Sequence, residues 1–252
     1  MYFKYLKHLC LCFVFSSNSI FAANIGLLIV ATGKYITYVD PLIASAEKHF
    51  CQDHNVTYFV FTDSVIPSTD KVIYIFQQRL GWPFDTMMRG QAYYYSKKLL
   101  AQQDYLFACD ADMRFVGPMG DEILGDRVAT LHAWFDPSYI IGRRGTYETN
   151  PKSTAYVAEH EGDYYFAGGF YGGSSDEFLK MTSSILTNIY KDLSNGLIAI
   201  WHDESHWNRY CIDHPPTVIL SSDYCFPEEI AIPGISKLLA LLKPHEEIRT
   251  ND

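Results

Sequence analysis

Hydrophobic and polar positions change along this chain in blocks that predict strands and helices in alternation. Mostly apolar runs are typical of strands buried on both faces, and they occupy residues 25–31, 57–62, 72–76, 105–109 and 128–132. Apolar residues at helical spacing predict helices over 41–50 and 84–102, and a third helix between Ser174 and the stop signal Asn195-Gly196. This order predicts an α/β fold with a mostly parallel central sheet.

The third helix carries the clearest signals. Ser174 and Glu177 have the spacing of a capping box at its start. Behind them, one apolar face is expected to be buried, and it consists of Phe178, Met181, Ile185, Ile189 and Leu193.

The chain has 252 residues, enough for one large domain with a substantial core. No internal repeat, low-complexity segment or linker divides residues 24–252, so we expect them to form one domain. The formal net charge of -9 argues against nucleic acid as a partner, because phosphate binding needs clustered Lys and Arg. An acidic surface suits a neutral glycan, and a 15% aromatic share suits sugar recognition, although most of these rings are expected to fill the core.

The first 23 residues differ from the rest. Positively charged residues precede an apolar run over 9–15, and a polar stretch over 16–19 interrupts it before 20–23. A charged front with an apolar middle is typical of a signal peptide, and the run is shorter than the ~20 residues of a membrane-spanning helix. Residues 1–23 are therefore consistent with a signal peptide that exports the chain or with a short hydrophobic anchor that gives weak membrane association. Without either role the chain would stay in the cytoplasm.

The cysteines after residue 24 show no metal-ligand spacing, so we expect free thiols at Cys51, Cys109, Cys211 and Cys225. A first candidate for chemistry follows the apolar run at 105–109, where Asp110 and Asp112 lie two positions apart. Ligands of open α/β sheets bind beyond the carboxyl ends of strands. Two carboxylates there can share Mn²⁺ or Mg²⁺, which in turn bridges to substrate phosphates. Acidic triplets also occur in ordinary surface turns.

A second candidate is the segment WHDESHWN at 201–208. His202 and His206 would share one helix face, as in a zinc site. A zinc protease needs its Glu directly after the first His, whereas Glu204 lies midway and on another face. We interpret Glu204 as a buried acid near a reacting centre. The alternative is that Asp203 caps a helix and the remaining residues pack.

A third candidate is DYYFAGGFYGG at 163–173, where two Gly pairs bracket aromatic residues. Such pairs suggest backbone passing close to a ligand, and the alternative is a bulged, tightly packed strand pair. Because no Lys-Ser/Thr follows, the segment is not a phosphate loop.

Together and in this order, the segments resemble glycosyltransferase family 6, the family of the histo-blood-group A and B transferases and α-1,3-galactosyltransferase. The resemblance runs from about residue 25 to 249. Residues 201–208 are similar to the family's WHDESHLN, and 161–173 to its glycine-rich strip. Shorter segments fit at the expected intervals, namely 46–50, 58–63, 110–112 and 130–132. With no stem region, the chain is similar to the short bacterial-type members.

The resemblance implies a GT-A fold and a retaining transfer of N-acetylgalactosamine or galactose, in α-1,3 linkage, from a UDP-sugar to a galactose-containing glycan. It implies Mn²⁺, with Mg²⁺ as the alternative, held by Asp110 and Asp112. Implied donor contacts are Val30, Ala31, Tyr35, Arg89, Asp110, Ala111, Asp112, Ala167, Gly168, Gly169, His202, Asp203, Lys243 and Arg249. Implied acceptor contacts are His132, Thr146, Trp201 and Glu204. Lys243, His245 and Arg249 match a tail that folds over the diphosphate.

The resemblance makes Glu204 the catalytic residue, either as a nucleophile or as a charge that stabilises an oxocarbenium-like state, and both remain open. Small residues at Ala167 and Gly169 favour N-acetylgalactosamine as the sugar. Pro227 replaces an acid that helps vertebrate members to select their acceptor, so acceptor identity does not carry over. Two other functions are an inactive glycan-binding protein on the same fold and a metal-dependent hydrolase that uses the HDESH segment.

Overall fold

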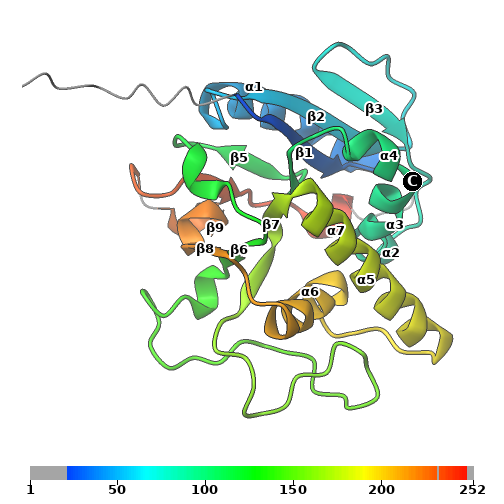
Figure 1. The fold of residues 1–252 in the computed structure, drawn as a ribbon, viewed down its shortest axis with the longest axis vertical. Helices are drawn as coiled ribbons and strands as arrows, with labels where there is room; N and C mark the ends of the chain where they lie inside the picture. Colours follow the sequence, from blue (N-terminus) through cyan, green and yellow to red (C-terminus); the bar gives the residue numbers. More distant parts are fainter. Residues whose placement is uncertain (1–21, 232, 249–252) are drawn as a thin grey trace, which may run out of the picture.

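A central sheet runs through the computed structural model, which describes residues 22–231 and 233–248 (Figure 1). It has seven strands in the order β3-β2-β1-β4-β7-β6-β8. Only β7 is antiparallel to its neighbours, and the other pairs are parallel. The strands are β1 (Asn24–Val30), β2 (Asn55–Thr62), β3 (Val72–Phe76), β4 (Tyr105–Asp110), β6 (Val128–Leu131), β7 (Phe166–Ser174) and β8 (Val218–Leu220). The predicted α/β fold with a mostly parallel sheet is confirmed.

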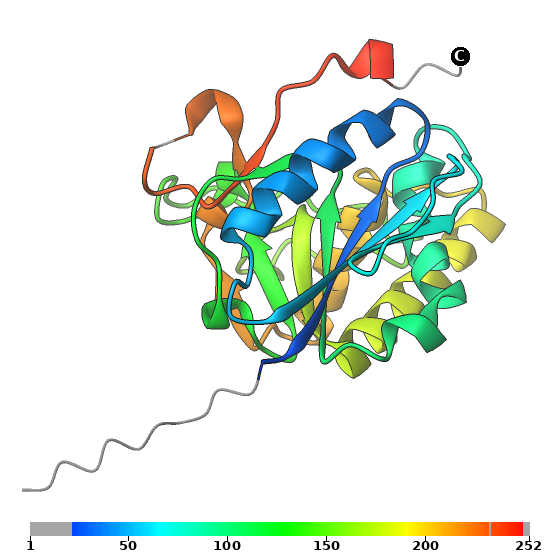
Figure 2. The same ribbon diagram turned by 90° about the horizontal axis from the view of Figure 1, so that it is seen from above.

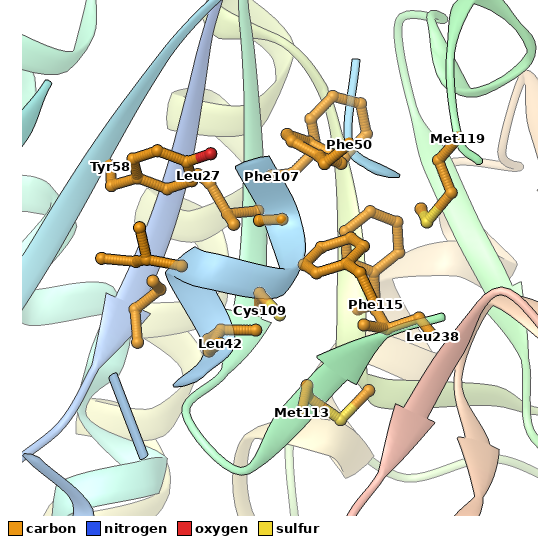
Figure 3. Close-up of a cluster of buried hydrophobic side chains, with 14 of the residues drawn as sticks. Leu27, Leu42, Phe50, Tyr58, Phe107, Cys109, Met113, Phe115, Met119 and Leu238 are labelled. Carbon is orange, nitrogen blue, oxygen red and sulfur yellow. The ribbon is translucent and has the colours of Figure 1, made fainter. Parts of the chain in front are cut away.

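Helices cover both faces of this sheet (Figure 2). The 3-10 helix η1 (Gly33–Tyr38) leads into α1 (Val39–His49), which lies on one face, whereas α5 (Ser175–Ser194) lies on the other. Alternate side chains of β1 serve the two layers, because Leu27 packs in the cluster under α1 and Leu28 in the cluster under α5. Figure 3 shows the first cluster, where Leu27 and Leu42 lie near a group of phenylalanine rings.

A smaller sheet has the strand order β5-β10-β9. Its strands are β5 (Met113–Phe115), β9 (Phe226–Pro227) and β10 (Leu238–Ala240). The remaining helices are α2 (Phe84–Met87), α3 (Arg89–Tyr95), α4 (Lys97–Leu100), α6 (His202–Asp213) and α7 (His245–Ile248), and the short 3-10 turns are η2 (Asp121–Ile123), η3 (Ala133–Phe135), η4 (Ser222–Tyr224) and η5 (Glu228–Ile230).

Two helix predictions are corrected. The predicted helix over 84–102 is divided into α2, α3 and α4, because Met88 and Ser96 adopt non-helical dihedral angles near φ -96° and ψ 14°, and φ -95° and ψ 4°. The predicted capping box at the start of α5 is wrong. Ser174 makes no side-chain cap hydrogen bond, and Glu177 pairs with Arg127 at 2.7 Å instead. An ion pair to Arg127, which directly precedes β6, has replaced a local bond.

Other predictions agree with the structure. The stop at Asn195-Gly196 ends α5, where Gly196 takes a φ of 68° that suits glycine. The four expected thiols are free. Across residues 22–231 and 233–248, no helix has the length and apolar character needed to cross a membrane. The predicted signal peptide or anchor lies outside the described residues, apart from Ala22 and Ala23.

The sheet order brings three segments to one edge. Val30, the last residue of β1, pairs with Asp110, the last residue of β4. Because β7 runs the opposite way, its first residues lie beside the last residues of β4, and Phe170 pairs with Cys109. The ends of two strands and the beginning of a third therefore meet where ligands of α/β sheets bind.

Candidate active site

The two acids of the Asp-Ala-Asp motif lie at this edge. Asp110 ends β4, and the chain turns at Ala111 and Asp112 before it enters β5. The Asp112 side chain is buried and that of Asp110 is 38% exposed. Asp112 pairs with the ammonium group of Lys243, which lies close because Leu241 N donates to Asp112 O at 2.9 Å. The turn is thus held against the last part of the described chain.

Arg89 is buried at the start of α3 and joins three elements. Its Nη1 lies 2.9 Å from Asp110 Oδ1 and 3.2 Å from Gly168 O, and its Nε lies 2.7 Å from Asp203 Oδ2. Burial lowers the pKa of Arg89, but Asp203 and Asp110 outweigh this effect and raise the pKa well above its usual range. The guanidinium is therefore a permanent positive charge between two acids.

Glu204 lies in the first turn of α6 and both of its carboxylate oxygens accept hydrogen bonds. Tyr165 Oη donates to Oε1 at 2.8 Å, and Gly168 N donates to Oε2 at 2.7 Å. Burial raises the pKa of Glu204 to about 7, against the effect of these two bonds. Burial likewise raises the pKa of Asp203 to about 6, although Arg89 opposes the shift. Two neighbouring acids thus titrate near neutrality.

The two histidines of the HDESH segment contact different elements. The His202 ring lies 5.1 Å from that of Trp82, and His202 has a φ of 53°. His206 is buried, with Nε2 3.8 Å from Asp192 Oδ2 in α5. Within the described ranges, no cluster of three or more His, Cys, Asp or Glu residues could hold a metal ion. The pair gives no support to a hydrolase with a zinc site.

The two Gly pairs of β7 have different surroundings. A Cβ on Gly168 would lie 3.2 Å from Glu204 Oε2, and one on Gly169 would lie 2.9 Å from Cys225 Sγ and 3.6 Å from Asp110 Oδ2. A Cβ on Gly172 would lie only 2.4 Å from Leu106 O inside the sheet. Gly168 and Gly169 therefore lie beside Glu204 and Asp110, as we expected of backbone that passes close to a ligand. The second Gly pair instead allows close packing within the sheet.

Two cavities meet at the Asp110–Asp112 turn. Both are lined by Asp110, Asp112 and Lys243. The first, of about 140 Å³, is also lined by Val30, Thr32, Tyr35, Trp82, Asp85, Thr86, Arg89, Cys109 and Ala111. The second, of about 280 Å³, is also lined by Met113, His132, Ala167, Gly169, Glu204, Cys225, Pro227, Glu229 and residues 240–242. Most of the expected donor residues therefore surround two adjoining spaces.

Other expected site residues lie outside this lining. The Ala31 side chain is buried in the core beside Val30. Trp201 is exposed, and its Nε1 donates to Thr146 Oγ1 at 2.9 Å. His245 begins α7, and Arg249 lies outside the described residues.

One expected acceptor residue, His132, does line the second cavity, where it follows β6. Burial is the main cause that lowers its pKa to about 4, and Arg143 adds to the shift. The imidazole is therefore neutral at pH 7.

Three residues of the site were missed by sequence reasoning. Tyr165 binds Glu204, and Cys225 lies against Gly169. Asn208 fixes α6 on β7, because Oδ1 accepts from Phe166 N and Nδ2 donates to Phe166 O, both at 2.8 Å. Asn208 follows Glu204 by four positions, and this same-face spacing is a signal that could have identified it. Tyr165 lies in the candidate segment 163–173, but nothing in the sequence shows that it binds Glu204, and Cys225 belongs to no motif.

Comparison with known proteins gives a consistent result. The chain matches the sequence model of Glycosyltransferase family 6 over residues 15–250. It is 36% identical over 242 residues to Histo-blood group ABO system transferase 1 of Rattus norvegicus, covering 90% of this chain and 68% of the relative. It is 33% identical over 230 residues to Globoside alpha-1,3-N-acetylgalactosaminyltransferase 1 of Homo sapiens, covering 86% and 65%. It is 30% identical over 220 residues to Alpha-1,3-galactosyltransferase 2 of Homo sapiens, covering 82% and 64%.

The raised pKa of Glu204 predicts a pH-dependent stability. The folded chain keeps a proton on Glu204 up to about pH 7, whereas its ordinary pKa is 4.5, so stability falls as pH rises through this window. In Glu204→Gln the charge never forms, while the amide can still accept from Gly168 and donate to Tyr165. We expect the variant to be more stable than the wild type at pH 8, on the order of a few kcal/mol, with the difference narrowing toward pH 5. Thermal melting of both proteins across this range measures it, and a gap that does not vary with pH would contradict the assignment.

Proposed function

Since the chain belongs to glycosyltransferase family 6, and is therefore a glycosyltransferase, we propose that it transfers N-acetylgalactosamine or galactose from a UDP-sugar to a galactose-containing glycan with retention, in α-1,3 linkage. One relative is named an alpha-1,3-N-acetylgalactosaminyltransferase and another an alpha-1,3-galactosyltransferase, which supports both sugars. The observation that carries the proposal is the position of Glu204 and of the Asp110–Asp112 turn in the walls of one cavity.

In this proposal the first cavity takes the UDP part of the donor. Val30 and Tyr35 offer an apolar wall and an aromatic ring for the base. Lys243 has its ammonium 5.3 Å from the centre of the Tyr35 ring, and Arg89 binds Asp110 in the wall of the same cavity. These two cations provide positive charge for the diphosphate, which gains negative charge as it leaves.

We propose that Asp110 and Asp112 hold Mn²⁺, or Mg²⁺ in its place. The fit is good, because the turn offers two hard carboxylate ligands where the two cavities join. In the described part of the chain no third acid, His or Cys completes a closed site, which suits an ion that takes its remaining ligands from phosphates and water. When bound, such an ion would offset the charge of the departing UDP.

The second cavity takes the sugar, with Glu204 in its wall. The two hydrogen bonds from Tyr165 and Gly168 fix the carboxylate, whose negative charge opposes the positive charge that develops at the anomeric carbon. UDP leaves with the electron pair of the bond to that carbon, and the acceptor oxygen forms the new bond as it loses its proton. Glu204 acts either as nucleophile in two successive inversions or as stabiliser of a same-face attack.

An assay of UDP release tests this function. We expect the wild type to release UDP faster when an accepted glycan is present. Glu204→Gln should bind the donor as the wild type does and turn over at least ~100-fold more slowly, because it lacks a charge directed at the transition state. Glu177→Gln, which alters only the pairs with Arg127 and Lys180 and leaves the site residues untouched, serves as the control.

The same assay separates the alternatives. An inactive glycan-binding protein would bind the glycan and release no UDP. A hydrolase would release UDP at a rate that does not depend on the glycan. Turnover of a folded Glu204→Gln protein near the wild-type rate would refute the role of Glu204.

Removal of divalent ions tests the metal proposal. Excess chelator should abolish transfer, and added Mn²⁺ should restore it. Asp112→Asn removes one anionic ligand and keeps the size, so Mn²⁺-dependent binding of UDP, measured by calorimetry, should weaken about tenfold or more. Asp121→Asn, at an exposed acid that pairs with His54, is the control. Full activity in chelator would exclude the proposal.

We further propose N-acetylgalactosamine as the preferred sugar. Ala167 and Gly169 both line the second cavity, and both residues are small, which leaves room for an acetamido group. A methyl group at Gly169 would meet Cys225 Sγ at 2.9 Å, so either the thiol or the methyl must move into the cavity. One added carbon atom at position 169 should therefore change the shape of the cavity wall.

Gly169→Ala tests this preference. The wild type should show a higher kcat/KM for UDP-N-acetylgalactosamine than for UDP-galactose with the same glycan. The variant should shift the ratio toward galactose by about ten- to two-hundredfold, the usual range for one group in a pocket. The double variant Gly169→Ala/Cys225→Ala removes the obstructing thiol and should recover part of the original ratio. A wild-type preference for galactose would contradict the proposal.

A further inference from the structure

The segment between η3 and β7, residues 136–165, has no helix or strand apart from an isolated bridge between Glu148 and Tyr156. Its middle is nevertheless buried, including Ser153 and Ala155. Segments of this length without regular structure keep one conformation only when tertiary contacts hold them. The segment also carries Thr146, so what holds it affects the candidate acceptor side of the site.

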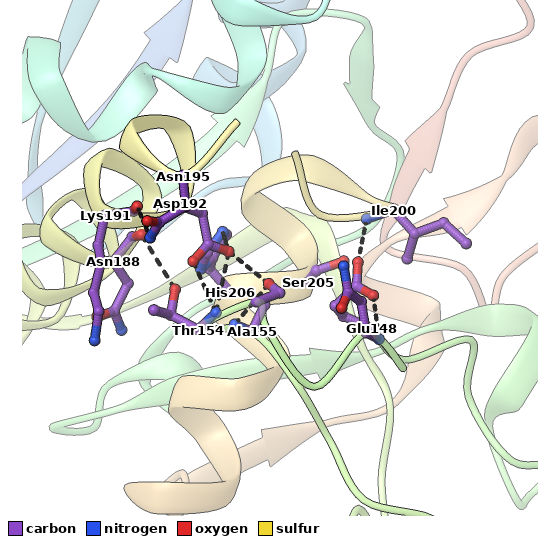
Figure 4. Close-up of polar contacts among 12 residues, drawn as sticks. Glu148, Thr154, Ala155, Asn188, Lys191, Asp192, Asn195, Ile200, Ser205 and His206 are labelled. Carbon is purple, nitrogen blue, oxygen red and sulfur yellow. Dashed lines mark hydrogen bonds and ion pairs between the residues drawn. The ribbon is translucent and has the colours of Figure 1, made fainter. Parts of the chain in front are cut away.

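The first of these contacts is made by Asp192 in the last turn of α5. Asp192 is 1% exposed, and both of its carboxylate oxygens face the segment. Ser153 Oγ donates to Oδ2 at 2.5 Å, and Thr154 N donates to Oδ1 at 2.8 Å (Figure 4). Hydrogen bonds to a buried charged group are among the stronger ones, so this acid fixes the middle of the segment to the helix.

The second contact is made by Glu148, which belongs to the segment and is also buried. Its Oε1 accepts from Asn150 N at 2.7 Å, and its Oε2 accepts from Ile200 N at 2.8 Å (Figure 4). Glu148 follows Thr146 by two positions, and Ile200 directly precedes Trp201. One carboxylate therefore ties together the backbones that carry these two side chains.

His206 links both contacts to the helix that carries Glu204. It is buried in α6 with Nε2 3.8 Å from Asp192 Oδ2, and Figure 4 shows it beside Asp192. Burial lowers its pKa to about 4, although Asp192 and Glu148 oppose the shift, so the ring is neutral at pH 7. The end of α5, the segment and the start of α6 thus share one buried polar cluster.

We propose that Glu148 and Asp192 are positioning residues for the acceptor. They hold the hydrogen-bonded pair of Thr146 and Trp201 at a fixed place relative to Glu204, and so set how well the glycan binds. The inference rests on the proposed function and on the family resemblance, which implies that Thr146 and Trp201 contact the acceptor. The donor residues are held by separate contacts around Arg89, so loss of this cluster leaves donor binding intact.

Glu148→Gln tests the proposal with little change in size. Its amide NH₂ would face one of the two backbone N–H groups that Glu148 now accepts from, so one contact is lost. We expect the KM for the glycan to rise about tenfold or more, the usual effect of losing a hydrogen bond to a charged group. The KM for the UDP-sugar and the rate of UDP-sugar hydrolysis without a glycan should not change. A merely structural role would impair glycan binding, donor binding and hydrolysis together.

Ser153→Ala is a second variant that keeps both carboxylates and removes the hydroxyl that donates to Asp192 and accepts from Ala155 N. It should raise the KM for the glycan in the same direction by a smaller factor, and it decides the question if Glu148→Gln does not fold. Glu177→Gln, the same substitution at the other end of α5, should behave as the wild type. Loss of donor binding or hydrolysis in step with transfer, or an unchanged KM for the glycan in both variants, would overturn the inference. A wild type that transfers to no glycan would overturn the proposed function, and this inference with it.

Discussion

The buried guanidinium of Arg89 is the constraint on which the site depends. A buried charge is costly unless it is paired, and Arg89 has partners on three elements: Asp110 from β4, Asp203 from α6 and the carbonyl of Gly168 from β7. Loss of either acid would detach one of the two elements that the guanidinium joins. The pairing therefore keeps the end of β4 and the start of α6 together, although they are far apart in the sequence.

Around Arg89, the charged side chains differ between the two cavities. Arg89 lines the first cavity and Glu204 lines the second, while Lys243 lines both. The Asp110–Asp112 turn separates them and belongs to both. This arrangement suits a reaction in which negative charge grows on the leaving group while positive charge grows on the sugar. Tyr165 and Asn208 keep Glu204 in place, the first through its carboxylate and the second through its backbone carbonyl.

Local patterns predicted much of this molecule because its strands are buried on both faces. The strand at 72–76 was predicted to the residue, and the acids of the turn were expected at the end of a strand. The spacing of Glu204 between two histidines argued against a zinc protease, and the two histidines contact different elements. Failures arose where a distant partner decided the outcome. Glu177 pairs with Arg127 of another element, and the sequence around Ser174 does not reveal that partner.

The residues around Glu204 were harder to predict from the sequence, because their partners also lie far away along the chain. The chain has nineteen tyrosines, and only the position of α6 shows that Tyr165 is the one that donates to Glu204. Cys225 carries no motif, yet its sulfur occupies the space behind Gly169. The resemblance to a known family named residues that lie together in the structure. Which atoms of these residues contact one another could be learned only from the folded chain.

The antiparallel strand β7 has a consequence for the order in which the molecule can fold during synthesis. The second edge of β4 stays unpaired until β7 has been synthesised. In the same way, β6 gains its pairing with β8 only after the chain has been made to residue 220. The ion pair between Asp112 and Lys243 spans 131 positions. Such distant pairings close slowly, because chain entropy is lost before the contact forms. On a ribosome the β1–β2–β3 layer can assemble early, whereas the acids of the turn gain their last partner only after nearly the whole described chain has been made.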